Sequence, residues 1–184
     1  MTDKFKNVSM NGRMAYTIMC VESYLAEKFP NKDWTLICKI LWQATSSNWG
    51  DWSDIYSSVI PDVIFQYEEY SNEDYEGILS EEEFQNVKNL FSGITKGIEN
   101  DPGDEVNYML NKPFEMAMVY EGTVIGDGKE SFNIIENAEN ILKKNGIALP
   151  DYKKVLFSSA DEHNGWGNDF DGEYLSIILN KEQK

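Results

Sequence analysis

The feature of this sequence that most constrains its fold is the recurrence of apolar residues at helical spacing in almost every segment. The clearest case begins at Ser80, where Ser80 and Glu83 have the spacing of a capping box. The apolar positions that follow on one helix face are Phe84, Val87, Phe91, Ile94 and Ile98. We therefore expect a helix over residues 80–98. Gly93 and Gly97 fall inside it, where each costs about 1 kcal/mol relative to alanine.

Other segments repeat this pattern, and no stretch alternates apolar and polar residues as a half-buried strand does. The helices that we expect cover residues 9–29, 33–45, 51–59, 61–70, 105–122 and 130–145. The second of these is apolar most of the way round, which predicts a central helix packed antiparallel to the first. Pro113 lies inside the 105–122 segment, so this segment is either kinked there or restarted by a cap at Asn111. Residues 149–156 are a short helix or turn.

The chain of 184 residues is therefore predicted to be all-α: a single-domain helical bundle of about seven to eight helices over residues 1–184, with a long C-terminal loop. Cys20 and Cys38 fall on apolar helix faces, which indicates buried thiols in a reducing compartment. The N-terminal residues lack the apolar core of a secretory signal, and no run is long enough to span a bilayer. These patterns favour a cytoplasmic protein.

The charge balance restricts the classes of partner. The chain carries 16 Lys and Arg against 32 Asp and Glu, a formal net charge of −16. Such a surface repels the phosphates of nucleic acids and the anionic lipids of membranes. It favours a cationic protein partner, although the acids also serve solubility. We expect no nucleic acid and no membrane as partners, and the oligomeric state stays open.

The acids are concentrated in residues 49–84, and the chain has no Lys or Arg between Lys39 and Lys88. Aromatic residues are interleaved with these acids, as in an interface with an apolar core and a polar rim. Glu81, Glu82 and Glu83 suit the first turn of a helix without any partner, so we leave them out. The candidate partner-binding residues are Trp49, Asp51, Asp54, Glu68, Glu69, Tyr70, Glu73, Asp74 and Glu76.

An apolar anchor at the centre of this candidate surface is either Trp49 or Tyr70. Trp52 faces inward on its helix, whereas Trp49 precedes the helix and is open to exposure. The alternative is that all five tryptophans are structural.

The tail loop around His163 is the best place to look for a catalytic or metal site. It fails the calcium-loop template in every register, and zinc requires more ligands than the single histidine supplies. No GxSxG elbow supports a serine nucleophile, and both cysteines lie in core patterns. The structural interpretation is that Trp166 packs on the body while Gly165 and Gly167 adopt positive φ. The glycine loop 122–129 lacks a phosphate-binding pattern. We expect no catalytic residue, no metal and no cofactor.

Two segments carry a family resemblance. DWTLICKILWQATSSNWGDW (33–52), followed by a short helix with Pro61 and an acidic patch, resembles an all-α immunity protein family of bacterial polymorphic, contact-dependent toxin systems. NGWGNDFDGEYLS (164–176) resembles the closing segment of that family, and the similarity extends from about Gly12 to Leu179. The family has a characteristic tryptophan, to which Trp42 and Trp166 are the closest matches by context.

The resemblance implies a cytoplasmic protein that binds and blocks a cognate toxin domain, and it supplies no catalytic residues. The acidic composition independently favours a basic, nuclease-like toxin whose active site the protein occludes. Two alternatives remain open from the sequence. One is an acidic helical adaptor or regulatory module for another basic protein, and the other is a hydrolase that uses the loop around His163.

Overall fold

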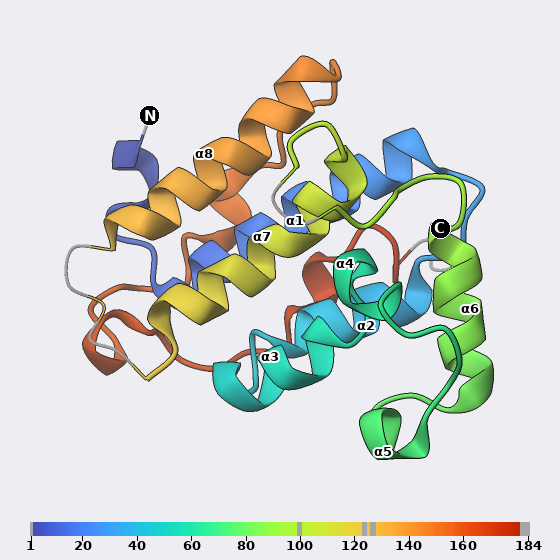
Figure 1. Ribbon diagram of the computed structural model, residues 1–184. Helices are drawn as coiled ribbons and strands as arrows, with labels where there is room; N and C mark the ends of the chain where they lie inside the picture. The colour runs from blue at the N-terminus through green and yellow to red at the C-terminus, as the bar shows by residue number, and fades with distance from the viewer. Residues whose placement is uncertain (1, 99–100, 123–124, 126–127, 181–184) are drawn as a thin grey trace.

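The computed structural model describes residues 2–98, 101–122, 125 and 128–180, and its regular elements are helices (Figure 1). Over these residues it has no strand, only an isolated bridge between Val8 and Ser159. The α-helices are α1 (Met10–Lys28), α2 (Thr35–Gln43), α3 (Trp49–Ser57), α4 (Pro61–Ile64), α5 (Asn72–Tyr75), α6 (Glu81–Phe91), α7 (Glu105–Tyr120) and α8 (Lys129–Lys144). The 3-10 helices are η1 (Thr2–Phe5), η2 (Tyr152–Val155), η3 (His163–Gly165) and η4 (Gly172–Leu175). The all-α prediction is confirmed.

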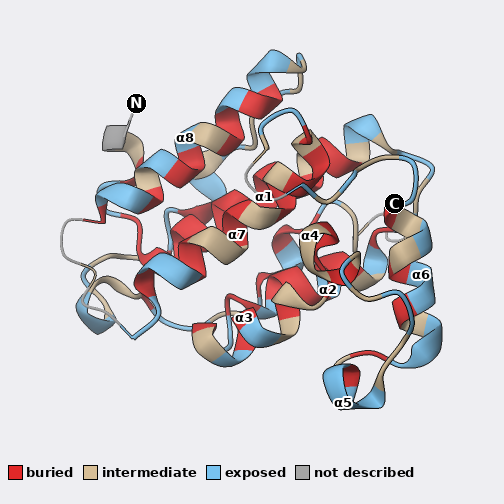
Figure 2. Ribbon diagram, viewed as in Figure 1, coloured by how far each residue is buried: buried red, intermediate tan, exposed pale blue. Residues whose placement is uncertain are grey.

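The central helix is α1, not α2 as the sequence suggested. Of its 19 residues, 15 are buried, and it packs against α2, α7, α8 and η2 (Figure 2). The sequence did not show that α1 is central, because several of its buried residues are polar. These residues are tolerated in the core because they are hydrogen-bonded. Arg13 donates to the carbonyls of Val8 and Phe5 and to the Ser131 hydroxyl.

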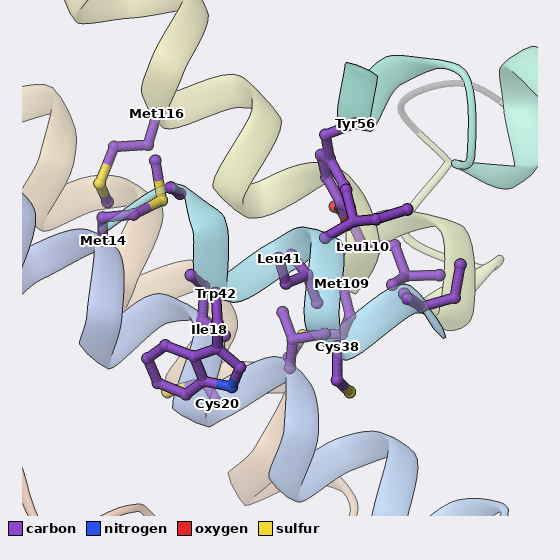
Figure 3. Packing of buried hydrophobic residues seen from close by; sticks show 14 of the residues in the cluster. Met14, Ile18, Cys20, Cys38, Leu41, Trp42, Tyr56, Met109, Leu110 and Met116 are labelled. Carbon is purple, nitrogen blue, oxygen red and sulfur yellow. Dashed lines mark hydrogen bonds between the residues drawn. The ribbon is translucent and has the colours of Figure 1, made fainter. Parts of the chain in front are cut away.

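The core is one continuous cluster in which α1, α2 and α7 converge (Figure 3). Met14, Ile18 and Trp42 lie at this junction. Both cysteines are free and buried, as the sequence predicted, and burial raises the pKa of the Cys20 thiol. In the part of the chain that the structure describes, no helix is both long enough and apolar enough to cross a bilayer.

Helix α7 continues through Pro113 and is not restarted. The Asn111 amide donates to the Asn107 carbonyl within the helix, so it does not cap a new one. A proline removes one hydrogen bond of the helical ladder. Close to this point, the Tyr56 hydroxyl donates to the Leu110 carbonyl at 2.7 Å and links α3 to α7.

Helix α6 has the predicted capping box, in which Ser80 and Glu83 bond each other's backbone N–H. It ends at Phe91, however, and the expectation of a helix to Ile98 was wrong. Gly93 and Gly97 adopt φ values of 77° and 63°, which a right-handed helix does not allow. At Gly97 a Cβ would lie 2.7 Å from the Pro61 carbonyl oxygen, so the glycine permits a close contact with α4.

The tail closes the molecule without the short terminal α-helix that we expected. The single turn η4 is followed by extended backbone at Ser176 (φ −63°, ψ 133°). The Ser176 hydroxyl and the Ile177 N–H both donate to the buried carboxylate of Glu22. These bonds from α1 hold the tail in a conformation that a helix cannot adopt.

Candidate functional site

All the acids that the sequence singled out are exposed: Asp51, Asp54, Glu68, Glu69, Glu73, Asp74 and Glu76. Within the described residues, none of these carboxylates takes part in a salt bridge or a side-chain hydrogen bond. Their negative charge is therefore presented to solvent and available to a partner.

The seven acids form two groups rather than one patch. Asp51 and Asp54 lie on α3, which packs against α7. The other five lie in residues 68–76, before, in and directly after α5. Figure 1 shows α5 at the lower edge, beside α6 and apart from α3. We call residues 66–80 the acidic arm. A stretch that is continuous in sequence thus faces solvent at two places.

An aromatic cluster holds the acidic arm against α6. The ring of Tyr75 lies 4.9 Å from that of Phe84 and 6.0 Å from that of Tyr70. Burial raises the pKa of Tyr75 to about 12, with smaller contributions from Tyr67 and Asp74. The Tyr70 hydroxyl donates to the Leu79 carbonyl at 3.1 Å, and Tyr70 is half-buried. Tyr70 therefore stabilises the arm and is less available as an exposed anchor for a partner.

Lys88 is the first cation after the acidic stretch, and its ammonium is occupied by the backbone. It donates to the carbonyl oxygens of Tyr67 and Glu68, where the arm crosses α6. This positions the arm and leaves its carboxylates without a paired cation among the described residues.

Trp49 is buried, which corrects its prediction as an exposed anchor. Its exposed fraction is 4%, and its indole N–H donates to the Ala44 carbonyl at 3.0 Å. Asn48 caps α3 by accepting from the N–H groups of Gly50 and Asp51. Trp49 is therefore the first residue inside the helix and points into the body. Trp52 is buried, as expected.

The tail loop packs against the body through Trp166, as the structural interpretation predicted. The Trp166 ring meets the Trp49 ring edge to face at 5.0 Å, and its carbonyl accepts the N–H of Asn11. Gly165 and Gly167 have positive φ, and so do His163 (45°) and Asn164 (55°).

A hollow of about 520 Å³ opens between this loop and the N-terminus of α3. We call it the tail hollow. Its lining residues are Asn11, Ser47, Asn48, His163, Asn164, Trp166, Gly167 and Asp169. Ser47, His163 and Asp169 have the side chains of a hydrolytic triad, but no hydrogen bond joins any two of them in the described chain. The described residues also contain no group of three His, Cys, Asp or Glu placed to hold a metal ion.

Sequence reasoning missed an exposed aromatic cluster in the tail. The Phe157 ring lies 4.9 Å from that of Phe170 and 6.2 Å from that of Tyr174. Phe157 and Tyr174 are 52% and 57% exposed. Partial burial and the nearby Asp171 raise the pKa of Tyr174. The only signal in the sequence was aromatic residues flanked by Ser, Gly and acids, which is weak.

A second set of carboxylates is structural. Asp104 accepts the Thr95 hydroxyl and the backbone N–H groups of Lys96 and Ile98. Glu139 pairs with Lys4 and Lys143. These acids stabilise loops and helix contacts, so the surface acids stand out by their lack of such roles.

Comparison with protein-family models, with curated proteins and with solved structures finds no match to this chain. The resemblance to immunity proteins therefore rests on the sequence segments alone.

Proposed function

We propose that this chain is an immunity protein that binds and neutralises a cognate secreted bacterial toxin. The toxin is basic and nuclease-like, and the acidic surface of this protein occludes its active site. The observation that carries the proposal is the set of seven exposed carboxylates that pair with no cation of the described chain. With a net charge of −16, they make a surface suited to a cationic protein.

The physical basis is competition with phosphate. A nuclease binds its substrate through Lys and Arg, which contact successive phosphates. Carboxylates on a folded surface offer the same cations negative oxygens at fixed positions, without a bond to cleave. Opposite charges also accelerate association by long-range attraction, which benefits an inhibitor that must act before the toxin does.

An interface of this kind also requires an apolar centre, because exposed charge pairs alone add little affinity. Trp49 cannot supply it, since it is buried. The aromatic cluster of the exposed Phe157 and Tyr174 with the half-buried Phe170 can supply it. Asp169, Asp171 and Glu173 adjoin this cluster in the chain. We assign the apolar anchor to this cluster, and place the action of the protein in the cytoplasm of the cell that makes it.

Genetic context and co-expression test this proposal. We expect a gene for a large secreted protein immediately upstream, with a toxin-like C-terminal domain. Cells that express this domain should survive only when they also make the immunity protein. A pull-down that recovers a basic protein other than a toxin domain would point to an adaptor instead.

Charge-reversed variants identify the surface. The triple change Glu68→Lys, Glu69→Lys and Glu73→Lys alters the acidic arm, and Asp51→Lys with Asp54→Lys alters α3. The matched control for the arm is Glu27→Lys, Glu130→Lys and Glu136→Lys, which makes the same change in net charge on exposed positions of α1 and α8. We expect the control to protect cells and at least one of the other two variants to fail. Full protection by both would remove these acids from the proposal.

A further inference from the structure

We propose that the tail hollow receives the guanidinium side chain of an arginine from the basic partner. This inference rests on the proposed function and deepens it, because it names the chemical group that the surface recognises. The hollow combines an aromatic wall, an exposed carboxylate and an amide oxygen that accepts no hydrogen bond from the described residues. An arginine side chain can use all three of these features.

The aromatic wall is Trp166. It is only partly buried and lines the hollow, while its ring is held edge to face by Trp49 at an interplanar angle of 82°. The backbone of Trp166 is fixed as well, because its carbonyl accepts the N–H of Asn11 at 3.0 Å. A ring that is fixed in this way offers a preformed surface on which a guanidinium can stack.

The acceptors are Asp169 and Asn11. Asp169 is exposed and carries the only carboxylate among the lining residues. Asn11 is only 6% exposed, and its Nδ2 donates to the Asn168 carbonyl and to Asp169 Oδ1, each at 3.4 Å. Its Oδ1 accepts no hydrogen bond from a described residue and is not a fully buried atom, so a donor that enters the hollow can bond to it.

The charge of the hollow selects a cation. Its lining residues include no Lys and no Arg, and Asp51, Asp161 and Glu162 lie close to them in the chain. An anion is therefore disfavoured. Between the two basic side chains, arginine fits better, because a planar guanidinium stacks on an indole and still has several N–H groups to donate to a carboxylate.

The loop that carries the hollow is held in an unusual conformation. His163 and Asn164 adopt left-handed backbone angles, which cost free energy for residues other than glycine. The N–H groups of Gly165 and Gly167 both donate to the Glu162 carbonyl, and these bonds fix the turn. Strain that is maintained by such bonds is typical of preorganised binding loops.

The experiment uses the whole protein and three small probes: N-acetyl-arginine methylamide, the corresponding lysine derivative and the citrulline derivative. Citrulline has the shape of arginine without its charge. Binding is followed by the NMR signals of the indole N–H groups, with Trp166→Phe to assign the Trp166 signal. We expect a saturable shift of that signal with the arginine probe. The lysine probe should have a dissociation constant at least about tenfold higher, and the citrulline probe should not reach saturation.

Two variants localise the binding. Asp169→Asn should weaken arginine binding by about tenfold or more, because it removes the charge from the hollow. Asp171→Asn is the matched control, because Asp171 is an exposed neighbour that is not in the lining, and it should leave binding unchanged. Equal binding of arginine and citrulline, or an unmoved Trp166 signal at saturating probe, would overturn the inference.

The outcome is separable from that of the proposed function. If the protein protects cells from the toxin but does not bind the arginine probe, the immunity function stands and the arginine site in the tail hollow is refuted. If the protein binds the probe through Trp166 and Asp169 but protects against no toxin, the arginine site stands and the immunity function is refuted.

Discussion

The indole N–H of Trp42 donates to the carboxylate of Glu22 at 2.8 Å, and both side chains are shut off from solvent in the core. The same carboxylate accepts the Ser176 hydroxyl at 2.5 Å and the Ile177 N–H at 2.7 Å. Helix α1 thus holds α2 and the tail through one charged group. Because the tail carries the exposed aromatic cluster and one wall of the tail hollow, this buried contact supports the proposed interface.

Trp42→Phe should destabilise the protein more than the same change at Trp34. Trp42 donates to a charged group, and such a bond contributes about 1.5–3 kcal/mol, against about 0.5–1.5 kcal/mol for a neutral one. Trp34 is the control, because it is equally buried but donates to the neutral Phe29 carbonyl at 3.3 Å. Urea unfolding measures both. Equal losses would show that the Glu22 charge adds nothing to the bond.

Gly167→Ala should cost clearly more stability than Gly93→Ala. Both glycines have positive φ, 80° and 77°, so both variants carry a similar backbone cost of about 1 kcal/mol. At Gly167 a Cβ would also lie 2.3 Å from the Ser9 hydroxyl oxygen, whereas at Gly93 nothing lies within 4 Å. Thermal unfolding of the two variants gives the comparison. Equal melting temperatures would mean that the tail loop does not pack this tightly on α1.

Glu139 should stabilise the protein at neutral pH and lose this contribution in acid. Burial alone raises the pKa of Glu139, but hydrogen bonds from Lys4, Lys143 and Tyr16 outweigh it and hold the pKa below its ordinary value. A lowered carboxyl pKa stabilises the fold above the unfolded value of about 4.3, and this contribution is lost as the pH falls below it. Glu139→Gln should therefore be about 1.5–3 kcal/mol less stable than the natural chain at pH 7 and much closer to it at pH 3.

The control for this pH dependence is Glu136→Gln, an exposed carboxylate on the same helix. It should follow the natural chain at every pH. A constant difference between Glu139→Gln and the natural chain from pH 7 to pH 3 would contradict the assignment of acid sensitivity to Glu139.

Phe157→Ala combined with Tyr174→Ala should weaken toxin binding without unfolding the protein. Each ring is more than half exposed, so the change in unfolding free energy should stay within about 1 kcal/mol. Loss of a central aromatic anchor typically costs 2 kcal/mol or more of binding, or roughly thirtyfold in affinity. Calorimetric titration of the toxin domain measures this effect, and unchanged affinity would place the apolar centre elsewhere.

Much of the fold followed from local patterns. The capping box of Ser80 and Glu83, the start of α1 at Ser9 and the end of α8 before Gly146 depend on residues close together in sequence. The end of α6 did not follow, because the apolar spacing continues past Phe91, whereas Gly93 and Gly97 adopt positive φ and end the helix. The centrality of α1 was hidden by Arg13 and Glu22, whose hydrogen-bond partners lie far along the chain.

The candidate surface was predicted in part. Exposure of the seven acids followed from their charge, but their division between α3 and the acidic arm depends on tertiary packing. Trp49 was misplaced in part because the ring that packs on it, Trp166, lies 5.0 Å away in space but more than one hundred residues away in sequence. Such pairings have no local signature.

The central claim is that the acidic surface recruits a basic toxin, and the association rate constant tests it most directly. It is measured for the purified protein and the toxin domain over a range of ionic strengths. We predict a rate that falls steeply as salt rises, and a much lower rate for the Glu68→Lys, Glu69→Lys and Glu73→Lys variant at low salt. A rate that is indifferent to salt, and equal in that variant and the natural chain, would contradict the claim.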